Sequence, residues 1–188
     1  MALKTALLIV LGFAAVACGS PKKYTHYYWR DYTGEVPCDA VVGGHDELNR
    51  TTYIGQGVAL NNDYYSLSPL TIVEGEKVQR APLWGYGMEV VQTRILCVTS
   101  PYPDKWIATN SKKLVADTVD EQLVLGGIEG SKHDNNVRYD LNIGRAKVGD
   151  KLITGKIITH DTYNSVLYVV DGWQAQEVQE FEVLVANN

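Results

Sequence analysis

Short apolar runs separated by turn-forming residues make up most of the chain beyond residue 26. Several runs alternate apolar with polar side chains, as a half-buried β-strand does. The best helix candidate, 111–122, contains β-branched residues that weaken a helix, and no other window shows a clear 3.6-residue period. The pattern therefore predicts an all-β fold, arranged as a β-sandwich or a barrel-like domain. The clearest predicted strands are 89–96, 137–143, 166–170 and 180–185.

The chain carries the same motifs twice, in the same order. Trp29 and Trp106 each open a unit, and Gly43-Gly44 matches Gly126-Gly127. Further matches join 53–57 with 142–146, 67–71 with 152–156 (allowing a one-residue slip), and the strand 89–96 with the strand that ends at Leu184. A unit this small buries little core alone, so we expect two repeats packed as one pseudo-twofold domain. The predicted repeats are 28–98 and 106–186, joined by a linker at 99–105, and the second is longer mainly in its loops.

The first residues read as a targeting signal. Lys4 precedes an apolar stretch at 6–17, and Ala15-Val16-Ala17 forms a small-residue cleavage site. We therefore expect a signal peptide at 1–17, a polar leader at 18–27 and a secreted, extracellular protein. Two alternatives are a bacterial lipobox that makes Cys18 a lipid anchor, and a buried N-terminal helix. The apolar stretch is shorter than a spanning helix needs, so no transmembrane segment is predicted.

The amino-acid composition limits the classes of partner that this protein is expected to bind. The 188 residues are 45% hydrophobic and 21% charged, which is typical of a soluble globular domain. The net charge is −5, and no basic patch exceeds Lys22-Lys23 or Lys112-Lys113, which argues against a nucleic-acid partner. The 12 tyrosines and 4 tryptophans suit β-sheets and also surfaces that bind sugars or proteins.

Two covalent features are expected of a secreted chain. With Cys18 at the cleavage site, Cys38 and Cys97 are predicted to form a disulfide, which would close a loop of about 60 residues. The alternatives are two buried free thiols, or a pair between Cys18 and one of the others. Asn49-Arg50-Thr51 is an N-x-T sequon, so Asn49 is a predicted glycosylation site in a eukaryotic host.

The paired motifs resemble the tandem DM-nine repeat family, which is found mostly in invertebrates. The resemblance covers about 28–185. The first copy supplies Trp29, Gly34-Glu35-Val36-Pro37, the segment 40–46 and Tyr53-Ile54-Gly55; the second supplies Trp106, Gly126-Gly127-Ile128-Glu129, the segment 143–146 and Gly155-Lys156.

This resemblance implies a secreted or cytosolic β-protein of two intertwined repeats. Some members are lectins of innate immunity that recognise mannose-type sugars, and their site uses the acidic residue after Gly-Gly and the Lys of a Pro-Gly-Lys turn. The corresponding positions are Asp46, Glu129 and Lys156. The first copy has Thr71 at the lysine position (Leu70 under the slip), so we expect its site to be weakened and look first to the second copy.

The residue types fit that chemistry. Sugar hydroxyls need carboxylate acceptors and cationic donors beside an aromatic face. Asp46, Glu129, Arg145 and Lys156 are the candidate carbohydrate-binding residues, and Trp84 and Trp173 are candidate aromatic faces. The alternative is structural: the acidic residues cap turns, the cations are solvated strand ends, and the glycine pairs permit positive φ or close backbone approach.

No catalytic residue, metal ligand or cofactor is predicted. His45, His133 and His160 each precede an aspartate, but none has the spacing of a zinc or hydrolase motif. The leading hypothesis is a non-catalytic lectin-like protein that binds a carbohydrate or microbial surface glycan. A structural or protein-interaction module without a sugar ligand is the alternative, and homo-oligomerisation is compatible with both. An enzyme would need convergent titratable groups in one pocket.

Overall fold

The structure is a computed structural model, and it describes residues 27–99, 104–133, 138–161 and 164–186. The predicted signal peptide and leader, apart from Tyr27, and residues 100–103 of the predicted linker lie outside this range. The first half contains β1 (Tyr27–Asp31), β2 (Val42–His45), β3 (Thr51–Leu60), β4 (Tyr64–Val73), β5 (Arg80–Leu83), β6 (Tyr86–Glu89) and β7 (Val91–Val98). The second half contains β8 (Lys105–Asn110), α1 (Leu114–Asp117), β9 (Gln122–Leu123), β10 (Leu125–Ser131), β11 (Arg138–Val148), β12 (Lys151–Asp161), β13 (Asn164–Asp171), β14 (Gln174–Val178) and β15 (Glu180–Ala186).

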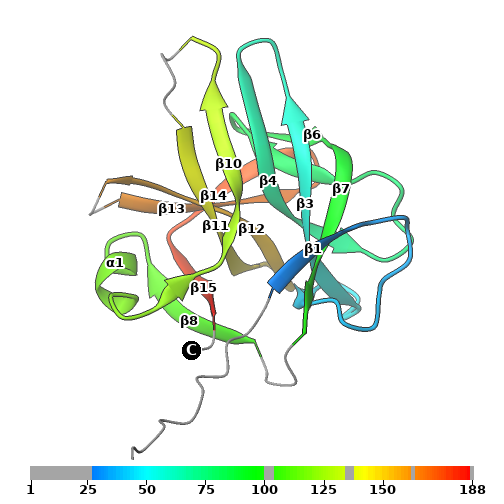
Figure 1. Cartoon of the computed structure of the whole chain (residues 1–188), viewed down its shortest axis with the longest axis horizontal. Coiled ribbons are helices and arrows are strands. Elements are labelled where there is room, and N and C mark those ends of the chain that lie inside the picture. Colours follow the sequence, from blue (N-terminus) through cyan, green and yellow to red (C-terminus); the bar gives the residue numbers. More distant parts are fainter. Residues whose placement is uncertain (1–26, 100–103, 134–137, 162–163, 187–188) are drawn as a thin grey trace, which may run out of the picture.

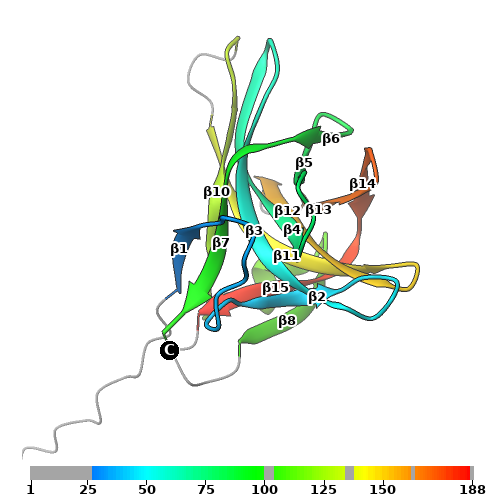
Figure 2. The same cartoon turned by 90° about the vertical axis from the view of Figure 1, so that its right-hand side faces the viewer.

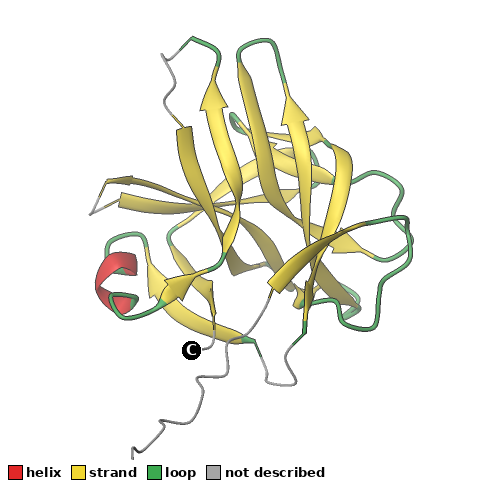
Figure 3. Ribbon diagram, in the orientation of Figure 1, coloured by secondary structure: helices red, strands yellow, loops and turns green. Residues whose placement is uncertain are grey.

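The prediction of an all-β fold is confirmed (Figure 3). The helix candidate at 111–122 forms only a single helical turn, α1. Its β-branched residues disfavour a longer helix, and a turn follows α1 directly. Among the described residues, no helix is long and apolar enough to cross a membrane.

The strands form one antiparallel sheet that closes on itself. The pairings run β12–β2–β3–β4–β10–β11 and return from β11 to β12, so six strands make a ring. Of the two arrangements expected from the sequence, this is the barrel-like one. The remaining strands extend from the ring as branches, and the β3–β4 and β10–β11 hairpins stand side by side (Figure 1).

Strand pairings recur in the two halves. β1–β7, β2–β3, β3–β4, β3–β7 and β5–β6 in the first half have counterparts in β8–β15, β10–β11, β11–β12, β11–β15 and β13–β14 in the second. Two further pairings, β4–β10 and β12–β2, join one half to the other. The ring therefore forms only when both halves contribute.

The core has three clusters of buried side chains. One belongs to the first half and includes Leu70 and Ile95, and another belongs to the second half and includes Ile157 and Val183. The third cluster is shared, with three buried residues from each half, and Trp29 and Trp106 pack against it. Burying each large aliphatic side chain contributes about 2 kcal/mol, so the shared cluster stabilises the association of the halves. Its members are Val41, Ile54, Leu96, Val124, Ile143 and Leu184.

Candidate functional site

Glu129 and Lys156 are brought together, as the sequence predicts, but in a closed environment. Glu129 lies on β10 and Lys156 on β12, and their side chains form an ion pair with exposed fractions of only 13% and 3%. The Tyr168 ring covers the ammonium, with Nζ 5.7 Å from the ring centroid. Burial lowers the pKa of Lys156 below its ordinary value, and the Glu129 carboxylate only partly offsets this. The two charges thus neutralise each other in the interior of the protein.

Asp46 follows β2 and organises the turn that leads to β3. Its carboxylate accepts hydrogen bonds from the backbone N–H of Leu48 (3.0 Å) and Arg50 (2.8 Å) and from Arg50 Nε (2.6 Å). Burial of the carboxyl raises its pKa, but the N–H donors and the guanidinium of Arg50 outweigh this and hold the pKa below its usual range. Asp46 therefore caps a turn, which is the structural alternative considered for this residue.

Arg145 ties the two halves together. Its Nε lies 2.7 Å from Glu182 Oε2, its Nη1 donates to the carbonyl of Gly43 (3.3 Å), and its guanidinium stacks 4.0 Å from the centroid of Trp106. Gln56 makes the matching bond from the first half, where Nε2 donates to the carbonyl of Gly126 (2.6 Å). Arg145 is thus engaged away from Glu129 and Lys156, and the four predicted residues do not form one site.

A cavity of about 240 Å³ lies beside Asp46. It forms where the end of β2 meets the start of β12 and where β4, β5 and β13 approach them. Its polar lining residues include Asp46, Arg50, Thr52, Thr71, Arg80 and Lys151. Both halves of the chain therefore contribute to its wall.

Two residues of the cavity lining hold buried polar atoms without a partner within the described ranges. Thr52 Oγ1 and Arg80 Nε have no hydrogen-bond partner among the described residues. A buried polar atom without a partner costs about 1–3 kcal/mol, so such atoms are rare in a folded protein. By contrast, Thr71 on the same wall is satisfied, because its hydroxyl bonds to the carbonyl of Thr154 (3.0 Å).

Lys151 and Asp171 add opposite charges to the rim. Lys151 Nζ lies 2.5 Å from Asp171 Oδ1 and 3.8 Å from Glu47 Oε2. The hydrogen bond that Lys151 donates to Asp171, with the charges of the nearby carboxylates, raises the pKa of Lys151 and keeps the ammonium charged. The rim thus offers both acceptors and donors to a ligand.

Four lining residues (Thr52, Arg80, Lys151 and Asp171) were not predicted from the sequence. They lie on separate strands of both halves, and their proximity depends on the pairing of β2 with β12. Hydrophobic alternation identifies strands but not their partners, so no signal in the sequence could have gathered these residues. The sequence predicts Asp46 of this lining as a site residue, and Trp84 and Trp173 as candidate aromatic faces.

Cys38 and Cys97 are free thiols in the structure, in place of the predicted disulfide. Cys97 packs in the core of the first half, whereas Cys38 lies exposed in the turn before Ala40, so the two thiols do not meet. Burial, with the nearby Asp39 carboxylate, raises the pKa of the Cys97 thiol to about 11. This thiol is therefore a poor nucleophile at neutral pH.

Asn49 lies exposed in the turn capped by Asp46, with a left-handed φ of 60°. Its backbone N–H donates to the carbonyl of Asp46 (3.1 Å). The sequon is thus in an exposed turn next to the rim of the cavity, and glycosylation of Asn49 stays a prediction.

The scan against protein-family models and the search of curated proteins both found no match for this chain. The likeness to DM-nine repeats therefore depends on the motifs themselves.

Proposed function

We propose that this protein is a secreted, non-catalytic lectin-like protein that binds carbohydrate, such as a microbial surface glycan, in the cavity beside Asp46. The observation that carries the proposal is that Thr52 and Arg80, two residues of the cavity lining, each hold a buried polar atom without a hydrogen-bond partner in the described part of the chain, Oγ1 and Nε. A sugar hydroxyl both donates and accepts, so a ring bound in the cavity can supply the missing partners when the Thr52 and Arg80 side chains turn toward it.

The size and polarity of the cavity support a sugar ligand. Its volume of about 240 Å³ is below the roughly 300–1,000 Å³ of pockets that hold drug-sized ligands, which suits a single sugar ring. Carboxylates and cations both line the cavity, among them Asp46, Asp171 and Lys151, and Trp173 follows the lining residue Gly172 in the sequence. These groups match what polyhydroxylated rings require.

This proposal puts the site in a cavity lined by both halves, rather than at the Glu129–Lys156 pair of the second copy. Glu129 and Lys156 neutralise each other in a buried pair, and a ligand would have to break that pair to reach either charge. The cavity beside Asp46 is lined by cations that are more exposed than Lys156, because the side chains of Arg50 and Lys151 have exposed fractions of 57% and 27%.

We also propose that the halves are tandem repeats of the DM-nine type, related by a pseudo-twofold axis. The corresponding strand pairings support this, as does the shared cluster in which Val41, Ile54 and Leu96 match Val124, Ile143 and Leu184. The matching bonds of Gln56 and Arg145 to the glycine pairs add further support.

A glycan array with the secreted protein tests the sugar-binding proposal. Thr52→Val removes the hydroxyl while keeping the shape, and we expect it to weaken binding to the best glycan about tenfold, as loss of one hydrogen bond to a ligand does. Thr93→Val on β7, outside the cavity lining, is the matched control and should bind like the wild type. Binding of no glycan, or equal binding by Thr52→Val and the wild type, would reject the site.

Secretion has a separate test. Protein recovered from the culture medium of expressing cells should begin near Cys18 when its N-terminus is sequenced. Retention inside the cell with Met1 intact would contradict the proposed localisation.

A further inference from the structure

Two hairpin turns lie against each other next to the cavity. The β5–β6 turn contains Trp84-Gly85 and the β13–β14 turn contains Gly172-Trp173. The Gly87 N–H donates to the carbonyl of Trp173 (2.9 Å), and the Ala175 N–H donates to the carbonyl of Gly85 (3.2 Å). Figure 2 shows the two hairpins together on one side of the molecule. The turns therefore form one continuous surface.

This surface, which we call the aromatic ledge, consists of Trp84, Tyr86 and Trp173. Their exposed fractions are 60%, 67% and 64%. Large aromatic side chains this exposed and this close together are uncommon on a protein without a ligand for them.

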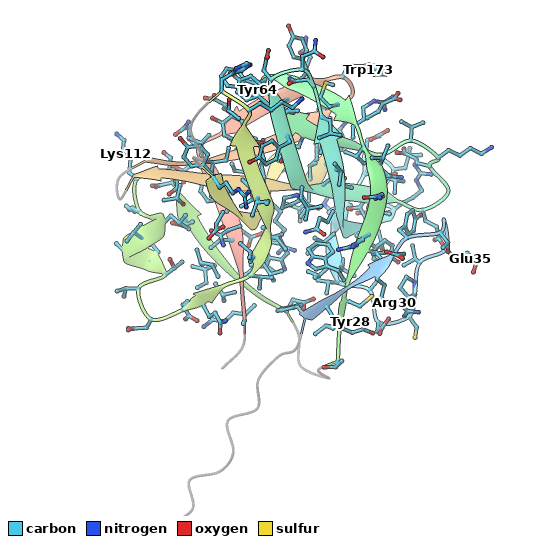
Figure 4. The ribbon with its side chains drawn as sticks, turned by 45° about the horizontal axis from the view of Figure 1, so that its top comes forward. Tyr28, Arg30, Glu35, Tyr64, Lys112 and Trp173 are labelled. Carbon is cyan, nitrogen blue, oxygen red and sulfur yellow. The ribbon has the colours of Figure 1, made fainter. Side chains whose placement is uncertain are left out.

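Both tryptophans are supported from behind. The Tyr64 ring stacks on Trp84 with the ring centroids 4.1 Å apart, and the Arg80 guanidinium lies 3.7 Å from the centroid of Trp173. Each indole thus has a protein group on one side, while more than half of its surface faces solvent. Trp173 and Tyr64 lie at the same end of the molecule, away from Tyr28 and Arg30 on β1 (Figure 4). Rings held in this way lose little conformational entropy when a flat ligand stacks on them.

Trp84 is held at a cost to the backbone. Its φ of 52° is in the left-handed region, and Gly85 follows with a φ of 80°, so both central residues of the turn have positive φ. Such a turn favours Asn-Gly, and a bulky residue at its first position is strained. Strained residues of this kind cluster at ligand-binding and other functional positions.

The aromatic ledge is continuous with the cavity. Arg80 lines the cavity and also backs Trp173, and Gly172 lines the cavity one residue before Trp173. A ligand that leaves the cavity past Gly172 therefore meets the ledge directly.

We infer that the aromatic ledge is a second subsite, which stacks the next sugar rings of an oligosaccharide whose end ring occupies the cavity. The C–H face of a pyranose ring is apolar and packs on an indole, while its hydroxyls point sideways into water. The inference depends on the proposed function and extends it, because it makes the ligand a chain of sugars rather than one ring.

Isothermal titration calorimetry on the secreted protein tests the ledge. The probes are D-mannose, D-glucose, D-galactose and N-acetylglucosamine. Each monosaccharide is compared with a linear trisaccharide built from three units of the same sugar. For the sugar that binds, we expect the trisaccharide to bind about tenfold more tightly than the monosaccharide. Trp84→Ala and Tyr86→Ser should each bring that affinity ratio close to one, and Val119→Ala, an exposed residue after α1, should leave it unchanged.

The outcomes separate the two proposals. If the monosaccharide binds but the trisaccharide gains nothing, or if the gain survives both ledge variants, the ledge has another role, such as protein contact, and the inference is wrong. If none of the probes binds, the proposed function fails together with it. Circular dichroism of each variant, and the milder Trp84→Phe, which should keep part of the gain, distinguish loss of stacking from loss of folding.

Discussion

The backbone of Gly44 on β2 lies against the carbonyl of Leu152 on β12, so closely that a Cβ at residue 44 would be 2.1 Å from that oxygen. The same relationship occurs between Gly127 and the carbonyl of Leu67, at 1.8 Å. These contacts lie where β2 crosses to β12 and where β10 crosses to β4. The glycine pairs thus permit the close backbone approach on which both joins between the halves depend.

Alanine at either crossing should destabilise the fold. Because the clash is with backbone rather than a movable side chain, we expect Gly44→Ala and Gly127→Ala to lower the free energy of unfolding by about 3 kcal/mol in urea denaturation. Gly149→Ala is the control: its φ is +60° with no atom within 4 Å, so only backbone strain of about 1 kcal/mol applies. Equal losses at residues 44 and 149 would contradict the close-approach explanation.

The Glu129–Lys156 pair should behave as a structural unit. Lys156→Met leaves a mostly buried carboxylate without its partner, and we expect a loss of about 3 kcal/mol in the free energy of unfolding. The double variant Glu129→Met/Lys156→Met removes both charges and should recover most of that loss. The exposed Arg94–Asp31 pair provides the comparison, since Arg94→Met should change stability by less than about 1 kcal/mol. A double variant less stable than the single one would argue for a role that needs the charges.

Asp46 should make the protein sensitive to acid. Its pKa is lowered in the folded protein, so the stabilisation is present above the unfolded-state pKa and is lost as the pH falls through the folded-state pKa. Wild type should therefore be more stable than Asp46→Asn at pH 7, and the gap should narrow steadily below about pH 4. Urea unfolding at several pH values measures this. Asp31→Asn, at an exposed carboxylate, is the control, and a gap for Asp46→Asn that is independent of pH would refute the assignment.

The two cysteines should differ sharply in reactivity. Cys38 is exposed, so iodoacetamide should alkylate it within minutes at pH 8, whereas buried Cys97, with its pKa raised to about 11, should react only after unfolding. Peptide mass spectrometry of the native and denatured protein reports each site separately. Recovery of a peptide that contains a Cys38–Cys97 disulfide would restore the prediction made from the sequence.

Local patterns were enough to predict much of the fold. The alternation at 180–185 and at 137–143 identified β15 and the start of β11, and the turn residues separated the hairpins. The motif alignment paired Gly44 with Gly127 and Leu67 with Leu152, the four residues that meet at the crossings. These features were accessible because each depends on neighbours in the sequence or on an internal comparison.

The site was harder to predict because it depends on burial and on partners from the other half. Nothing local distinguishes the lysine that is buried against Glu129, Lys156, from the one that borders a cavity, Lys151. The same holds for the cysteines: their number gives possible pairs, but only the fold places Cys97 in the core and Cys38 outside it.

The strands that join the halves also determine when this protein can fold during synthesis. β2 obtains its partner β12 only after most of the second half has left the ribosome, and the Gly43–Arg145 bond spans 102 residues of chain. Until then, one edge of β2 and one edge of β4 in the nascent first half have no partner strand. Such unpaired edges can pair with another chain. Two molecules that exchanged halves would satisfy the same pairings.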